Sequence, residues 1–156
     1  MRTYQCNSPQ AAGRLVALSL LADGHVSSHE LKALRDARLA ERLGLAPDEF
    51  PKIVQGLCED LMSVAHLNWG DLCLPNSEVM QHLITELKDP QMRAEVISLC
   101  KVAVEADRHV AQGEIDVLRA FEQAWQLPRR RPKHSSVDQY QTTATAIAPN
   151  RHHFTT

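Results

Sequence analysis

Two matching stretches decide the fold: "ADGHVSSHEL" at residues 22–31 and "ADRHVAQGEI" at residues 106–115. Ala, Asp, His, Val and Glu recur at the same positions, 84 residues apart, and an aliphatic residue closes each stretch. In both, Asp stands where one helical pattern ends, and Glu follows seven residues later, in the first turn of the next helix. We therefore expect two pseudo-repeated helix–turn–helix units, each with an acidic turn.

Apolar residues at helical spacing extend on both sides of these turns. The pairs Ser8–Pro9 and Asp89–Pro90 each predict a capping residue followed by a first-turn proline. Gly and Pro predict a loop at 66–77. Helices are expected over about 9–22, 28–43, 47–61, 77–88, 90–106 and 112–127. The sequence thus predicts an all-α fold, a compact bundle of about six to seven helices within residues 1–127.

Composition separates an acidic body from a basic end. Residues 128–156 carry five Lys or Arg and one Asp, a charge of +4, whereas the rest of the chain carries −6. This end has no sustained apolar period, so we expect a flexible, solvated tail. The stretch "MRTYQCNSPQ" is polar, and no apolar run approaches the length of a membrane span. A cytoplasmic protein is therefore expected.

The cysteines carry no metal or redox motif. None of the four, Cys6, Cys58, Cys73 and Cys100, belongs to a CxxC pair. Cys58 and Cys100 fall within apolar helical patterns, where a free cysteine behaves as a small hydrophobic residue. Reduced, structural thiols are expected rather than disulfides or a soft-metal site.

The acidic turns supply the chemistry expected of a metal site. If the two units pair, their carboxylates, those of Asp23, Glu30, Asp107 and Glu114, would gather in one place. Several carboxylate oxygens suit a hard divalent cation. Ca²⁺, Mg²⁺, Mn²⁺ and Zn²⁺ all stay open as the ion. His25 and His109 occupy matching positions and are further candidate ligands.

The acidic turns also have a purely structural interpretation, in which no metal is bound. Ser27 and Glu30 form a capping-box pattern, which explains the first turn without any ion. The second turn has Ala111 at the position of the capping Ser and Arg108 at the position of the Gly that follows Asp in the first turn. Asp107 and Glu114 are nevertheless present. Inheritance through duplication would also keep them. The pattern disfavours a complete EF-hand, because the first half of its loop pattern fails.

The chain resembles the TerB-like family of tellurite-resistance-associated domains. The resemblance rests on "RLVALSLLADGHVSSHELKAL", "ERLGLAPDEF" and "LCKVAVEADRHVAQGEIDVL", and it covers about residues 8–127. Arg108 departs from the Gly that the family's second turn carries. The resemblance implies an all-helical, pseudo-symmetric domain, a divalent-metal site at the four acidic residues, and a role in tellurite or other chemical stress beside membrane-associated partners.

These observations favour a non-catalytic, metal-binding module in stress response. The alternative is an interaction scaffold without metal that binds a protein or a membrane surface. A hydrolase is the weakest reading, because the chain has no GxSxG, no HExxH and no phosphate-cradling Gly loop. We expect an unidentified protein partner within a membrane-associated complex. We expect no specific binding to a nucleic acid.

Overall fold

The computed structural model describes residues 1–22, 24, 26–64, 77–106 and 111–126. All regular secondary structure in these ranges is helical, so the all-α prediction is confirmed for the part of the chain described. Its seven helices are α1 (Pro9–Leu20), α2 (Ser28–Asp36), α3 (Leu39–Leu43), α4 (Glu49–Val64), α5 (Ser77–Thr85), α6 (Pro90–Ala106) and α7 (Gln112–Ala124). The tail predicted at 128–156 lies outside the described residues.

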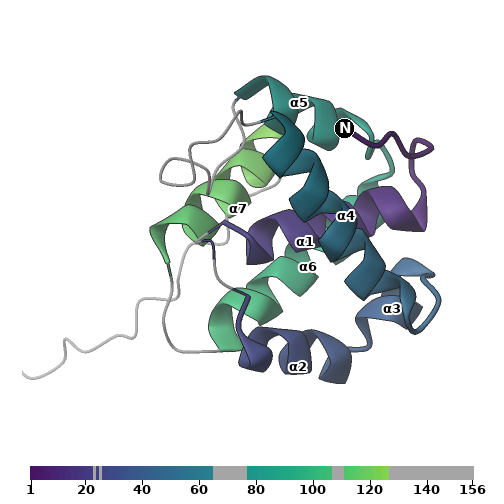
Figure 1. Ribbon diagram of the computed structural model, residues 1–156, viewed down its shortest axis with the longest axis vertical. Helices are drawn as coiled ribbons and strands as arrows, with labels where there is room; N and C mark the ends of the chain where they lie inside the picture. The colour runs from purple at the N-terminus through teal and green to yellow at the C-terminus, as the bar shows by residue number, and fades with distance from the viewer. Residues whose placement is uncertain (23, 25, 65–76, 107–110, 127–156) are drawn as a thin grey trace, which may run out of the picture.

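Helix α1 is the centre of the bundle. Every residue from Ala11 to Leu20 is buried, which is the mark of a helix enclosed on all sides. It packs against α4, α6 and α7, and α6 in turn packs against α2 (Figure 1). The helices that flank the two acidic turns therefore share one core. No helix in the described ranges has the length and apolar character needed to cross a bilayer.

Both predicted cap-and-proline starts are confirmed. The Ser8 hydroxyl accepts a hydrogen bond from the Ala11 N–H at 3.1 Å, at the start of α1. The Asp89 carboxylate accepts one from the Met92 N–H at 2.8 Å, at the start of α6. Each cap satisfies a backbone donor that the helix itself leaves without a partner.

The prediction of a single helix over residues 28–43 is wrong. The chain breaks after α2, and Arg38 adopts a left-handed conformation with φ of 59° before α3 begins. Leu34 and Leu39 are five residues apart, so in one continuous helix they would point about 140° away from each other. The break lets both enter the core, where they are 2% and 4% exposed.

The three described cysteines are free thiols in very different surroundings. Cys6 is exposed and Cys58 is partly buried, whereas Cys100 is fully buried in the core. Burial raises the pKa of the Cys100 thiol to about 12. None of these three is disulfide-bonded within the described ranges, the reduced state stays a prediction, and Cys73 lies outside the described residues.

Thiol alkylation should follow this order of exposure. Iodoacetamide should label Cys6 within the native protein, while Cys100 should react only after unfolding, because both access and thiolate formation are suppressed. Peptide mapping by mass spectrometry after timed labelling would measure the two rates separately. Comparable rates at Cys6 and Cys100 would contradict the packing of α6.

Candidate metal centre

Two of the six predicted ligands lie in the described part of the chain. These are Glu30 at the start of α2 and Glu114 at the start of α7. The other four, Asp23, His25, Asp107 and His109, lie outside the described residues. The geometry on which the site depends is therefore that of the two helix starts and the chain that leads to them.

Glu30 completes the predicted capping box of α2. Its Oε2 atom accepts a hydrogen bond from the Ser27 N–H at 2.7 Å, and the Ser27 hydroxyl accepts one from the His29 N–H at 3.1 Å. The carboxylate is almost completely buried, with 2% of the residue exposed. A carboxylate at this depth needs polar partners or a cation to offset the loss of its hydration.

Glu114 repeats the arrangement at the start of α7. Its Oε2 atom accepts from the Ala111 N–H at 3.0 Å, and the residue is 3% exposed. Ala111 has φ and ψ of −74° and 147°, close to the −74° and 140° of Ser27. Because alanine has no hydroxyl, only the glutamate half of the capping box exists here. The two matched stretches of sequence thus place both glutamates in the same local conformation.

Glu49 gives an internal reference for what capping alone requires. It accepts from the Ala46 N–H at 3.0 Å in the same way, but no acidic turn precedes it. Glu49 is only partly buried. Hydrogen bonds from the Gln10 side chain and the Ala46 N–H hold its pKa below the usual range. The cap bond therefore does not itself require burial, and Glu30 and Glu114 are buried because α2 packs on α6 and α7 packs on α1 and α6.

Ala22, the residue before Asp23, lies directly against the start of α7. A Cβ atom added to Gly113 would sit 2.3 Å from the backbone oxygen of Ala22, so only glycine fits at this point. Ala22 precedes Asp23 in the chain, and Gly113 precedes Glu114. The fold thus brings the backbone of one acidic turn into contact with the helix that carries the glutamate of the other.

Within the described ranges, no three His, Cys, Asp or Glu side chains gather in a metal-binding group. Only Glu30 and Glu114 among the predicted ligands fall within these ranges, so the four-carboxylate site stays a prediction. Carboxylate oxygens are the ligands that Ca²⁺, Mg²⁺ and Mn²⁺ prefer. Zn²⁺ would call on imidazole ligands as well, for which His25 and His109 are the candidates.

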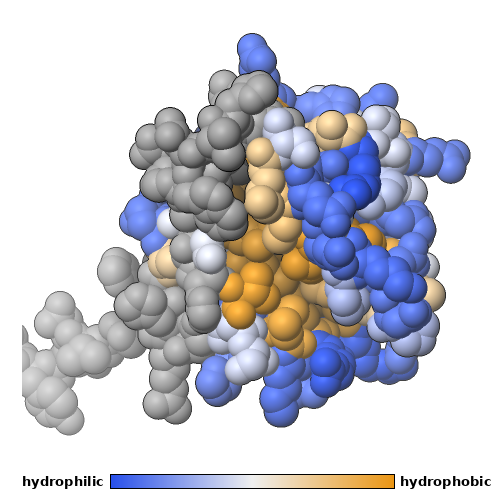
Figure 2. All heavy atoms as spheres, viewed as in Figure 1, coloured by the Kyte–Doolittle hydropathy of each residue, from blue (hydrophilic) through white to orange (hydrophobic). Residues whose placement is uncertain are grey.

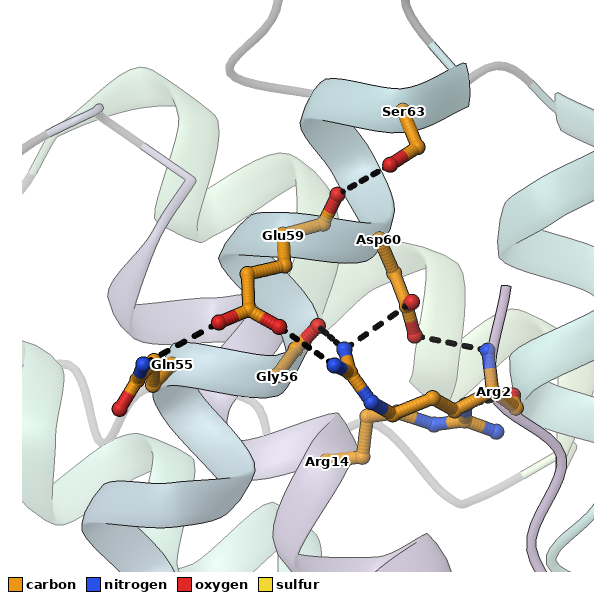
Figure 3. Close-up of polar contacts among 7 residues, drawn as sticks. All are labelled: Arg2, Arg14, Gln55, Gly56, Glu59, Asp60 and Ser63. Carbon is orange, nitrogen blue, oxygen red and sulfur yellow. Dashed lines mark hydrogen bonds and ion pairs between the residues drawn. The ribbon is translucent and has the colours of Figure 1, made fainter.

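A second polar cluster, absent from the sequence predictions, ties the N-terminal arm to the bundle (Figure 3). Arg2 reaches α4, where it pairs with Glu59 and Asp60 and donates to the Gly56 carbonyl. The hydrogen bond from Arg2 lowers the pKa of Glu59. These charged groups pair with one another, so we interpret the cluster as a structural clamp that holds the N-terminal arm against α4.

Arg14 forms the buried part of this clamp. It is 2% exposed, donates to the Arg2 carbonyl at 2.6 Å and pairs with Glu86. Its guanidinium also lies over the Tyr4 ring, 4.7 Å from the centroid. The signal in the sequence is an arginine inside a helix whose neighbours are almost all apolar. Such a residue in a buried helix requires a buried acidic partner.

Searches against protein-family models, curated proteins and solved structures found no match for this chain.

Proposed function

We propose that this chain is a TerB-like, non-catalytic module that binds one divalent cation through Asp23, Glu30, Asp107 and Glu114. The observation that carries the proposal is the matched pair of glutamates. Both are buried to within a few per cent, and both are held by the same bond to a cap N–H. A carboxylate can accept that N–H with one oxygen and bind a cation with the other, since it offers about four lone-pair sites.

The contact between Ala22 and Gly113 supports a shared site. It leaves Asp23 one residue from a backbone that touches the start of α7. A cation between the turns would neutralise carboxylates that otherwise repel one another. The role in tellurite or other chemical stress, and a cytoplasmic setting, are carried over with the TerB-like assignment. Free thiols at three positions are ordinary in a reducing compartment.

Cation-dependent stabilisation tests the site. At about 100 times its dissociation constant, a cation bound only by the folded state should stabilise the protein by about 2.7 kcal/mol. For a chain of this size, that corresponds to a rise of about 5–10 °C in the thermal midpoint. Differential scanning calorimetry of metal-free protein, with Ca²⁺, Mg²⁺, Mn²⁺ or Zn²⁺ added in turn, would measure the shift.

Three glutamine variants separate cation binding from capping. Glutamine still accepts the cap N–H, so Glu30→Gln and Glu114→Gln should keep their helix starts while losing most of the cation-dependent shift. Asp23→Ala and Asp107→Ala should lose it as well. Glu49→Gln is the matched control, because it has the same cap bond outside the acidic turns. The proposal is wrong if no cation raises the thermal midpoint of the wild type. It is also wrong if Glu49→Gln loses the cation-dependent rise as completely as Glu30→Gln and Glu114→Gln.

A further inference from the structure

An apolar groove opens between α2 and the start of α4, and its lining begins at Leu31, the residue after Glu30. It has a volume of about 390 Å³, and Figure 2 shows hydrophobic surface in the region between these two helices, with hydrophilic side chains along its right and lower edges. Its apolar lining includes Leu31, Leu34, Leu39, Phe50, Pro47 and Pro51. We call this feature the α2–α4 groove.

Leu31 distinguishes this groove from ordinary surface. It is 37% exposed and is one of three large hydrophobic side chains exposed in the described ranges. The floor beneath it is rigid, because Leu34, Leu39 and Phe50 are at most 8% exposed and belong to the core. Pro47 and Pro51 stiffen the opposite wall. A preformed apolar surface of this kind favours binding, since little ordering is needed when a partner arrives.

The charged side chains around the groove favour a partner that carries a negative charge. Lys32 pairs with Asp36, and Arg38 pairs with Glu41. Arg42, further along, pairs with Glu95. The Arg35 side chain lines the groove, and its guanidinium has no ion-pair or hydrogen-bond partner within the residues that the structure describes, whereas the Arg35 backbone carbonyl accepts from the Arg38 N–H. One cationic group is thus left over beside the apolar surface, and a carboxylate on the bound partner would complement it.

We propose that the α2–α4 groove docks an amphipathic helix of a partner protein, with its apolar face on Leu31 and Phe50 and an acidic residue against Arg35. Helices bind such grooves through apolar residues spaced three or four apart, and a flanking charge sets their orientation. The basic segment 128–156 is a poor occupant, because its charge of +4 has the same sign as Arg35. The proposal is independent of the cation site.

Selection from an unbiased library tests both the site and the partner chemistry. Randomised helical peptides displayed on phage would be panned against the full chain in the presence of a chelator. We expect the enriched peptides to combine apolar residues at i, i+3 or i+4 and i+7 with a neighbouring Asp or Glu. Their affinity should fall about tenfold or more on Leu31→Asp, because an exposed anchor is replaced by a charge.

Two further variants make the result specific. Arg35→Glu should weaken the acidic peptides and strengthen versions in which Lys replaces the acidic residue. Met62→Asp is the matched control, because Met62 is also an exposed hydrophobic residue, 54% exposed, but does not line the groove. It should leave binding unchanged. The absence of enriched peptides, equal binding to Leu31→Asp, or enrichment of basic peptides would each overturn the proposal.

Sedimentation of the full chain addresses the remaining occupant. A monomer across the working concentration range is expected. A dimer that Leu31→Asp dissociates would show that a second copy of this chain fills the groove, and the proposed partner helix would then be wrong.

Discussion

Replacing Arg14 with methionine should destabilise the protein by about 3–5 kcal/mol, the cost of leaving a buried charge without its partner. Glu86, which is 9% exposed, would lose its ion pair with Arg14. Its Oε1 atom is already buried without a hydrogen-bond partner in the described ranges, and His82 lies 3.5 Å away. The arm carbonyl of Arg2 would lose its donor as well. Thermal denaturation should show a fall of roughly 6–20 °C in the midpoint.

Two companion variants identify the cause. Adding Glu86→Gln to Arg14→Met removes the unpaired charge and should recover a large part of the loss. Lys52→Met, which breaks the exposed pair of Lys52 with Asp48, should leave the midpoint almost unchanged, because exposed pairs contribute little. If Arg14→Met were as stable as Lys52→Met, the clamp would not be the buried structural element that its geometry indicates.

The parts of the fold that depend on local chemistry could be predicted from sequence. Ser8 and Asp89 cap helices as their patterns indicate, and Ser27 with Glu30 forms the expected capping box. The break at Arg38 could not be predicted, since nothing in the local sequence forbids a continuous helix. It follows from tertiary packing, which rewards the burial of both Leu34 and Leu39.

The candidate site divides in the same way. The sequence places Glu30 and Glu114 at helix starts, and both lie there. Their burial depends on how α1, α2, α6 and α7 pack, which periodicity does not reveal. One signal was present in the letters "AQGE". A glycine within a helix lowers the stability of that helix relative to alanine, so its presence indicates that another group lies too close for a side chain. That group is the Ala22 carbonyl.

Filling that contact should have the second large effect. Gly113→Ala is expected to destabilise the protein by about 3 kcal/mol, at the upper end of what overpacking costs. In an open helix the same change would stabilise by about 0.5–1 kcal/mol, so the expected sign is reversed. The reason is that the added Cβ would meet a backbone oxygen at 2.3 Å, and a carbonyl cannot rotate aside as the end of a side chain can. Urea denaturation would measure the difference.

Gly56→Ala is the matched control within α4. Its added Cβ would lie 3.2 Å from the Arg2 Nη1 atom, a side-chain atom that has to shift by only a few tenths of an ångström, so the loss of stability should be much smaller than at Gly113. The two variants also bear on the cation site. Displacing Ala22 moves the residue next to Asp23, so Gly113→Ala should reduce the cation-dependent rise in midpoint while Gly56→Ala preserves it. Equal stability of the two variants would show that α7 does not press on the first acidic turn, and the argument for a shared site would lose its basis.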